Sequence, residues 1–273
     1  MKDTILHLRH HLAAEPFIDD IIGHTSSYET AALFNDRIPD AFEPQGYRFC
    51  QLDRCPPPWQ WGWTVSGAWI AVTGQLPQSR SMGYQRVALL HAHFGPTGVW
   101  ALPLRRRLDV PLITTFYGYD ISQHPRRLVW RLLYRLLFSK GDCFLVLGPD
   151  MRRRLVALGC PPEKIRIHNV GVNVSQIPFG TRHAPQEEGH LRILMAGRLV
   201  EKKGFRYGIQ AFVRLVRCFP EAEMRIVGDG PEEDQLRNLI NREGLDPRVR
   251  FLGRVPRSTL REEMARAHLF MAP

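Results

Sequence analysis

The stretch LRILMAGRLVEKKGFRYGIQAF combines cations and glycines in a spacing that suits phosphate binding. We expect a buried strand to end at Gly197 and a helix to begin at Gly204. The loop between them carries Arg198, Lys202 and Lys203. Such a loop presents backbone N–H groups and the positive end of a helix to an anion, and its cationic side chains add charge-assisted hydrogen bonds to phosphate oxygens. The residues therefore favour a diphosphate ligand, with solvated loop lysines as the alternative interpretation.

A second glycine-containing loop, VGDGP, places Gly228 and Gly230 at the end of a later predicted strand. Glycine there permits close approach of another backbone or of a ligand, but a tight turn with positive φ would need the same residue. Neither loop matches the P-loop pattern or GxGxxG, so the ATPase and dinucleotide-binding classes lose their main support. No DxD-like metal motif is evident.

The elements that must position these loops alternate between short apolar runs and helical patterns, which is typical of βαβ units with a parallel sheet. Strands are expected near residues 47–52, 86–93, 111–118, 143–148, 164–170, 191–197, 222–228, 249–253 and 268–273. Helices are expected near residues 97–108, 125–140, 149–159, 204–218, 231–243 and 257–267. The pattern predicts an α/β fold.

The polar segment PFGTRHAPQEEGH contains glycine and proline and has no periodicity, so it is the natural linker between two α/β halves. We expect an amino-terminal domain over residues 1–178, a linker over 179–190 and a carboxyl-terminal domain over 191–273. The length of 273 residues agrees with two domains, at roughly 150 residues per domain.

The composition restricts both the class of protein and its partners. Hydrophobic residues make up 44% and charged residues 23% of the chain, as in globular rather than disordered or fibrous proteins. The formal net charge of +10 points to an anionic partner, which could be nucleic acid, a membrane surface or a phosphorylated substrate. We expect no nucleic-acid partner, because the arginines are spread over several helices without a recognised motif.

The cysteines and the apolar segments indicate the cellular compartment of the protein. The five cysteines lie far apart with no CxxC pair, which fits neither a disulfide framework nor a zinc site. The first residues lack the apolar run of a signal peptide, and no uncharged apolar stretch of about 18 residues could span a bilayer. We therefore expect a cytoplasmic protein.

Several motifs in order resemble one enzyme family. GRLVEKKGF, RIVGDGPEEDQL, VRFLGRVP and REEMARAHLFMAP resemble the carboxyl-terminal domain of the family 4 glycosyltransferases, also called group 1. HAHFG, PLITTFYGYDIS and LVLGPDMRRRLVALGCPPEKIRIHNVGVN resemble the amino-terminal domain of the same enzymes. The resemblance covers roughly residues 85 to 273. It implies the GT-B fold, in which two Rossmann-like domains face each other with the sugar donor in the cleft.

The resemblance assigns a donor-binding role to residues of the second half. Arg198 and Lys203 match the pair that binds the donor diphosphate and neutralises the leaving group, for which the family needs no metal ion. The resemblance therefore implies no metal and no cofactor. The remaining positions that the resemblance places near the nucleotide are Gly197, Gly204, Gly228, Gly230 and Arg254, the last at the edge that contacts the base.

In the first half the resemblance points to Tyr117 and Asp120 as catalytic candidates, and His93 is a third candidate because it ends a strand at the edge where α/β folds bind ligands. Tyr117 stands where the family commonly has a histidine that faces the reacting sugar. A tyrosine can donate a hydrogen bond, but it does not titrate near neutral pH as an imidazole does, so a proton-handling role is in doubt. Asp120 could instead cap the turn that follows it, and His91 and His93 could be packing histidines at the end of a strand.

Two further segments could face a lipid surface. The helix PRRLVWRLLYRLLFSK has basic and apolar faces, which suit either packing on the sheet or a peripheral contact with an anionic membrane. The segment CPPPWQWGWTVSGAW holds four tryptophans, which suit either a loop packed on the core or an aromatic surface for acceptor or lipid headgroups.

The resemblance implies a nucleotide-sugar-dependent, hexosyl-type glycosyltransferase of the retaining kind. The acceptor would be a polysaccharide, an oligosaccharide or a lipid-linked glycan. A glutamate-rich motif of the family is expected just beyond HLFMAP, where this sequence ends at Pro273, so we expect the second domain to be incomplete. The alternative is a catalytically incompetent, truncated remnant that keeps only diphosphate or nucleotide binding.

Overall fold

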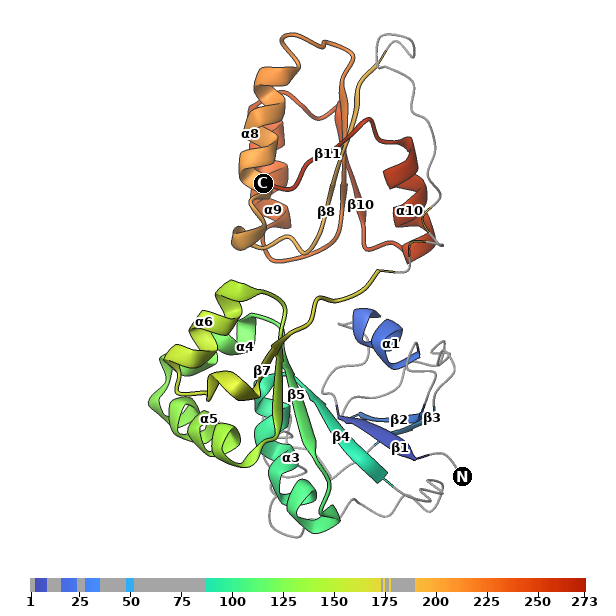
Figure 1. The fold of residues 1–273 in the computed structure, drawn as a ribbon. Helices are drawn as coiled ribbons and strands as arrows, with labels where there is room; N and C mark the ends of the chain where they lie inside the picture. Colours follow the sequence, from blue (N-terminus) through green and yellow to red (C-terminus); the bar gives the residue numbers. More distant parts are fainter. Residues whose placement is uncertain are drawn as a thin grey trace. The chain divides into compact units, whose positions relative to one another are not determined.

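The computed structural model describes residues 3–8, 16–23, 28–34, 48–51, 87–172, 174, 177 and 190–273. The chain divides into two compact units, Met1–Asn173 and Val174–Pro273. The tryptophan-rich segment lies outside the described residues, as does the expected linker apart from its last residue, His190. Each unit is an α/β structure built on its own parallel sheet (Figure 1).

The first unit is built on a seven-stranded parallel sheet in the order β3-β2-β1-β4-β5-β6-β7. Its strands are β1 (Thr4–Leu8), β2 (Glu29–Phe34), β3 (Arg48–Gln51), β4 (Val87–His93), β5 (Leu112–Phe116), β6 (Cys143–Val146) and β7 (Ile165–Ile167). Its helices are α1 (Pro16–Gly23), α3 (Gly95–Leu108), α4 (Tyr119–Ser122), α5 (Leu128–Lys140) and α6 (Pro149–Ala157).

The core of the first unit forms where helices cover the sheet. All five residues of β1 are buried, as expected for a central strand of a parallel sheet with both faces covered. Under α5, Tyr134, Leu137 and Phe138 are buried, and the ring of Phe138 meets that of Phe144 on β6 edge-on at 5.3 Å. The aromatic rings between α5 and the sheet hold the end of the sheet at which β4 and β5 lead into the loops with the candidate residues.

The second unit has a four-stranded parallel sheet in the order β10-β9-β8-β11. Its strands are β8 (Arg192–Ala196), β9 (Glu223–Val227), β10 (Val249–Gly253) and β11 (Leu269–Phe270). Its helices are α8 (Phe205–Leu215), α9 (Glu233–Arg242) and α10 (Arg257–Arg266). Buried Met195, Phe212 and Met224 belong to the core between this sheet and the helices α8 and α9.

All nine predicted strands and all six predicted helices are present, with ends that differ by a few residues. The structure adds β1, α1, β2 and the short helix α4, which the sequence patterns did not identify. Among the described residues, no helix has both the length and the apolar character that a membrane span requires.

Candidate functional site

The loop after β8 forms the strand, turn and helix start that the sequence predicts. Gly197 follows the strand with φ +151°, a short 3-10 turn runs over Glu201–Lys203, and Gly204 adopts φ +68° at the start of α8. The turn is closed by the Gly204 N–H, which donates to the Glu201 carbonyl at 3.0 Å. A residue with the left-handed backbone conformation ends the turn and lets α8 start in a new direction. Glycine adopts this conformation without steric cost, which explains its presence at position 204.

The two predicted phosphate-binding cations lie on this loop and are exposed. Within the part of the chain that the structure describes, no hydrogen bond or ion pair engages the side chain of Arg198 or Lys203. The stem of Lys203 runs beside Gly197, since a Cβ atom added at Gly197 would lie 3.9 Å from both Cδ and Cε of the lysine. The loop therefore carries cations available to an external anion.

The glycines of the VGDGP loop are explained by close packing of two backbones. The Leu199 N–H donates to the Asp229 carbonyl at 2.8 Å, which ties this loop to the loop after β8. A Cβ at Gly230 would lie 2.5 Å from the Leu199 carbonyl oxygen, and one at Gly228 would overlap the Gly197 carbonyl. The approaching backbone is thus that of the neighbouring loop, and both glycines also have positive φ.

A third loop joins this edge of the sheet. The Gly228 N–H donates to the Gly253 carbonyl at 2.8 Å, and the exposed Arg254 follows directly. The carboxyl ends of β8, β9 and β10 therefore meet, at the edge where α/β folds bind ligands. The structure brings together every donor-binding residue that the sequence singled out: Gly197, Arg198, Lys203, Gly204, Gly228, Gly230 and Arg254. Their roles in binding stay predictions.

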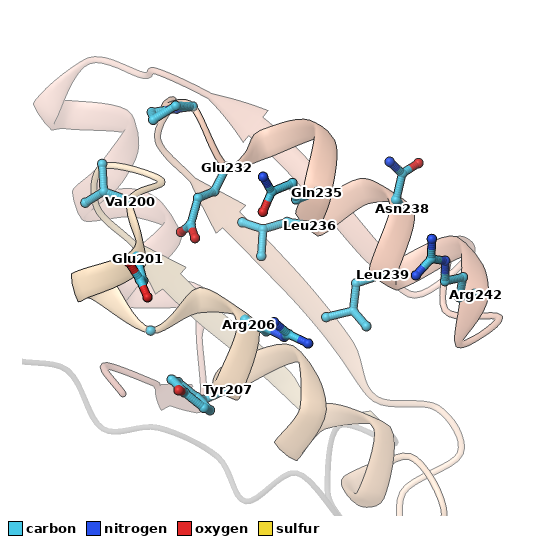
Figure 2. Close-up of a pocket in the computed structure, with 12 residues that line it drawn as sticks. Val200, Glu201, Arg206, Tyr207, Glu232, Gln235, Leu236, Asn238, Leu239 and Arg242 are labelled. Carbon is cyan, nitrogen blue, oxygen red and sulfur yellow. The ribbon is translucent and has the colours of Figure 1, made fainter.

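A pocket of about 710 Å³ lies beside this edge, between α8 and α9. Figure 2 shows Arg206 of α8 and Leu239 of α9 pointing toward one another across it. Its lining mixes both charges, including Glu201, Glu232 and Arg242, and takes only Gly204 from the predicted residues. The sequence patterns did not predict this pocket.

In the first unit, the loop after β5 is organised by the Asp120 carboxylate, which is buried. Its oxygens accept backbone N–H groups from Gly95 at 3.0 Å, Gly118 at 2.9 Å, and Tyr117 and Ile121 at 3.1 Å each. Burial raises the pKa of Asp120, and these hydrogen bonds oppose the rise by stabilising the charged form. The geometry is that of a capping residue, and a direct role at a reacting sugar stays a prediction.

Tyr117 and His93 lie side by side at the carboxyl ends of β5 and β4. The Tyr117 hydroxyl is 2.7 Å from Nδ1 of His93, and the histidine ring is fully buried. Tyr117 itself is only partly buried. A hydroxyl on a partly buried ring, held by a buried imidazole, is suited to donate a hydrogen bond rather than to transfer a proton.

A third histidine, His7 on β1, completes a cluster with His91 and His93 that sequence reasoning missed. Among the described residues this is the one group of histidines, cysteines or carboxylates whose candidate metal-ligand atoms all lie within 4.8 Å of one another. The ring of His91 stacks on that of His93 at 4.4 Å, and burial lowers the pKa of His91 from 6.5 to about 4. The cluster therefore holds packed imidazoles, of which His91 stays neutral at neutral pH.

The basic helix α5 has two apolar faces. One face packs on the sheet, as one of the two interpretations of the sequence expects. The other leaves Leu128, Val129, Leu132 and Leu136 exposed, at 70%, 55%, 54% and 48% of their surface. Exposed cations lie around this second face, which we call the α5 outer face: Arg126, Arg127, Arg131, Arg135 and Lys140.

Two family models match the chain. The model described as "Glycosyl transferase 4-like domain" matches residues 22–171. The model described as "Glycosyl transferases group 1" matches residues 181–273.

Two curated bacterial proteins show the same similarity at the sequence level. WcaL of Salmonella typhimurium, named for colanic acid biosynthesis, is 34% identical over 184 residues, which cover 67% of this chain and 45% of WcaL. AmsK of Erwinia amylovora, an amylovoran biosynthesis glycosyltransferase, is 32% identical over 187 residues, which cover 66% of this chain and 44% of AmsK. The matched part thus spans a little under half the length of these relatives.

Solved structures show the same fold at lower identity. HepE of Anabaena, in complex with UDP and glucose, superposes with a TM-score of 0.75 at 17% identity, over 100% of this chain and 74% of HepE. Sucrose-phosphate synthase from Thermosynechococcus elongatus superposes with a TM-score of 0.72 at 15% identity, over 100% of this chain and 75% of the synthase.

Proposed function

Since the chain belongs to the group 1 glycosyltransferases and has their GT-B type of α/β fold, we propose that it transfers a hexose from a nucleotide-sugar donor to a glycan. The fold class predicted from the sequence, two Rossmann-like α/β units, is confirmed. The names of WcaL and AmsK, which refer to colanic acid and amylovoran biosynthesis, support a glycan acceptor, for which we propose a polysaccharide, an oligosaccharide or a lipid-linked glycan.

One observation carries the proposal. Arg198 and Lys203 are exposed at the carboxyl edge of the second sheet, and no described side chain pairs with either of them. Two unpaired cations beside the start of a helix are the arrangement that a diphosphate requires.

We propose that these cations act on the leaving group. As the bond between sugar and phosphate breaks, negative charge develops on the nucleoside diphosphate, and fixed cations stabilise that charge without reorganisation. In this proposal Arg198 and Lys203 fill the role that a metal ion has in other transferases, so no cofactor is needed. The acceptor hydroxyl attacks the face of the sugar that the leaving diphosphate occupies, which retains the anomeric configuration, and we assign no protein nucleophile.

The first prediction concerns the donor. We expect UDP and UDP-glucose to raise the melting temperature of the protein, because UDP and UDP-glucose are bound in HepE, whose fold this chain shares. A ligand present at 100 times its Kd stabilises the folded state by about 2.7 kcal/mol. A thermal-shift series with UDP, GDP, ADP and their glucose conjugates measures the effect, with uridine as the control that lacks phosphate.

Three outcomes of that series have different meanings. Stabilisation by a nucleoside diphosphate, followed by release of the diphosphate in the presence of an acceptor glycan, supports the transferase. Stabilisation without any release, across a panel of acceptors, favours the alternative of a protein that only binds nucleotide. No stabilisation by any nucleotide contradicts both.

We further propose that the protein works at the cytoplasmic surface of a membrane, with the α5 outer face in contact with anionic lipid. Leu128, Leu132 and Leu136 follow one another at a spacing of four residues, so they form one stripe along the helix. No acidic residue occurs between Ile121 and Gly141, so the charged side chains of this segment are all positive. Apolar side chains with a border of arginines suit the boundary between headgroups and acyl chains.

A second prediction tests this contact. We expect the double substitution Leu132→Gln and Leu136→Gln to weaken binding to vesicles of phosphatidylcholine and phosphatidylglycerol by at least about tenfold, because two leucines lose their burial in lipid. Reversing Arg131 and Arg135 to glutamate should abolish the preference for phosphatidylglycerol. Vesicle co-sedimentation measures both.

The matched controls lie on α8 and just beyond its end. Tyr207→Gln removes an exposed apolar side chain away from α5 and is the control for the leucine variants. Arg214→Glu with Arg217→Glu changes the net charge as much as the reversal of Arg131 and Arg135 does. If these variants lose vesicle binding as strongly as the α5 variants, the contact depends on overall charge and hydrophobicity, and the α5 outer face is not the docking surface.

A further inference from the structure

The pocket between α8 and α9, which we call the α8–α9 pocket, has walls that the core of the second unit holds in place. The walls come from the two helices and from the turns that precede them. Leu236 of α9 is buried in the core, and Leu239 packs against the same core. The volume of about 710 Å³ lies within the range of about 300 to 1,000 Å³ in which proteins bind small ligands. The size and the walls therefore suit a binding site.

The side chains around the two leucines are mainly polar. They comprise two carboxylates, two guanidinium groups, two amides and a phenol: Glu201, Glu232, Arg206, Arg242, Gln235, Asn238 and Tyr207. Figure 2 shows Arg206 of α8 and Glu232, at the start of α9, directed into the space between the helices. Donor and acceptor groups thus surround an apolar floor.

These polar groups are available to a ligand. Within the part of the second unit that the structure describes, none of the seven side chains is engaged by a hydrogen bond or an ion pair. Two neighbours on α9 that lie outside the pocket behave differently, since Glu233 and Arg237 pair with each other at 2.7 Å. The helix can therefore pair its own charges, but it does not do so in the pocket.

The mixture of charges selects the chemical class of the ligand. A phosphate offers only acceptor oxygens and negative charge, so it would lie against Glu201 and Glu232. An ammonium group only donates, so it would lie against Arg206 and Arg242. A sugar hydroxyl donates and accepts, and the C–H groups of a sugar ring can cover the two leucines. Two charges of each sign sum to zero, which suits a neutral ligand.

We propose that the α8–α9 pocket is a saccharide-binding site that takes a neutral segment of a glycan and is separate from the donor-binding residues. Gly204 is the one predicted donor-binding residue in its lining, so a nucleotide and a saccharide bind at the same time. The inference goes beyond the proposed function, because a protein that holds a glycan without transferring a sugar would also use this site.

The first experiment measures occupancy of the pocket in the full chain. Val200, Leu236 and Leu239 line it, so their methyl signals report a bound ligand in NMR spectra of protein labelled at leucine and valine methyl groups. The probes are maltotetraose, cellotetraose and tetrasaccharides of galactose and of mannose. We expect at least one of them to shift these signals in a saturable way, also with UDP present, and inorganic phosphate not to shift them.

Three results of this experiment overturn the inference. The first is that no neutral tetrasaccharide shifts the three sets of methyl signals. The second is that phosphate shifts them instead. The third is that UDP abolishes the shifts caused by the saccharide, because the pocket would then belong to the nucleotide site.

The second experiment identifies the groups that hold the saccharide. We expect Arg206→Gln and Glu232→Gln each to weaken binding of the tetrasaccharide by about tenfold, because a hydrogen bond to a charged group is lost. The direction of the Glu232→Gln effect separates the ligand classes, since loss of a carboxylate weakens binding of a neutral sugar and strengthens binding of an anion. Tighter or unchanged binding in Glu232→Gln contradicts the inference.

Glu233→Gln is the matched control, because it makes the same change at the next position in a residue that pairs with Arg237 outside the pocket. It should change the affinity for the saccharide by less than about twofold. A loss as large as that of Glu232→Gln would show that the charge of α9, and not the pocket, sets the affinity. Saccharide binding without UDP binding would contradict the proposed transferase and leave this inference standing, and UDP binding without saccharide binding would do the reverse.

Discussion

Replacement of both Arg198 and Lys203 by alanine is expected to lower kcat/KM for sugar transfer by about 10⁴-fold, since removing one preorganised group that stabilises developing charge costs about 10² to 10³-fold. Each single substitution should cost at least about 10²-fold, mainly in kcat, because the diphosphate is most negative as it leaves. Release of nucleoside diphosphate during transfer measures the loss. Melting temperatures should change little, because both side chains are exposed and no described group pairs with them.

Lys202 provides the control for this prediction. It lies in the same 3-10 turn, is equally exposed and has the same charge, but the resemblance assigns it no contact with the donor. Lys202→Ala should lower kcat/KM by less than about threefold, as expected for a solvated surface charge. If Lys202→Ala lowers kcat/KM as much as Lys203→Ala does, the loop acts only through its total charge, and the proposed contact of Lys203 with the diphosphate is wrong. If neither Arg198→Ala nor Lys203→Ala affects transfer, the donor diphosphate binds elsewhere.

The sequence predicted the second unit well because local patterns determine it. Each strand there is an apolar run that ends at a glycine or a charged loop, and each helix begins within a few residues of that loop. The edge formed by Gly197, Gly228 and Gly253 follows from strand order alone, since parallel strands place their carboxyl ends together. What the patterns left open was which backbone Gly228 and Gly230 approach. The answer, the loop at 197–199, requires tertiary contacts.

The histidine cluster could not be predicted, because it depends on pairing over long distances in sequence. His7 and His93 are separated by 86 positions and meet only because β1 lies beside β4. The run TILHL is a short strand with a polar residue inside it. No pattern beside it in the sequence predicts a helix or a turn, so the run is not recognised as part of a βα unit. A histidine in an apolar run of five was the one available signal, and it is a weak one.

Helix α5 shows a different limit of sequence reasoning. Its pattern predicts the helix, but leucines and arginines around nearly the whole circumference do not say which apolar face is covered. The structure shows that Tyr134, Leu137 and Phe138 face the core, which leaves the stripe at Leu132 and Leu136 exposed. The two interpretations of the helix are therefore compatible, since one face packs on the sheet while the other is available for a partner.

Asp120 is where the largest effect on stability is expected. Its buried carboxylate holds the start of α3 through Gly95, the end of β5 through Tyr117 and the start of α4 through Ile121. Tyr134 of α5 adds a hydrogen bond to the Asp120 carbonyl at 3.0 Å. Four elements thus converge on one residue, and loss of the carboxylate leaves several buried N–H groups without an acceptor.

We expect Asp120→Ala to lower the free energy of unfolding of the first unit by about 4 kcal/mol, since each buried donor left without a partner costs about 1 to 3 kcal/mol. Asp120→Asn should cost about half as much, because one amide oxygen still accepts. Urea unfolding measures both. Asp150→Ala is the control: this exposed aspartate of α6 pairs with Arg153 and Arg154 at the surface, and its loss should cost about 1 kcal/mol or less.

The same pair of substitutions separates the structural role of Asp120 from a catalytic one. If the carboxylate acts only as a cap, Asp120→Asn should retain transfer in proportion to the fraction that stays folded. If transfer falls by more than about 10²-fold in protein that remains folded, the carboxylate contributes to catalysis beyond its hydrogen bonds. An unfolding free energy that Asp120→Ala leaves unchanged would contradict the capping role, because four N–H groups cannot lose a buried acceptor without cost.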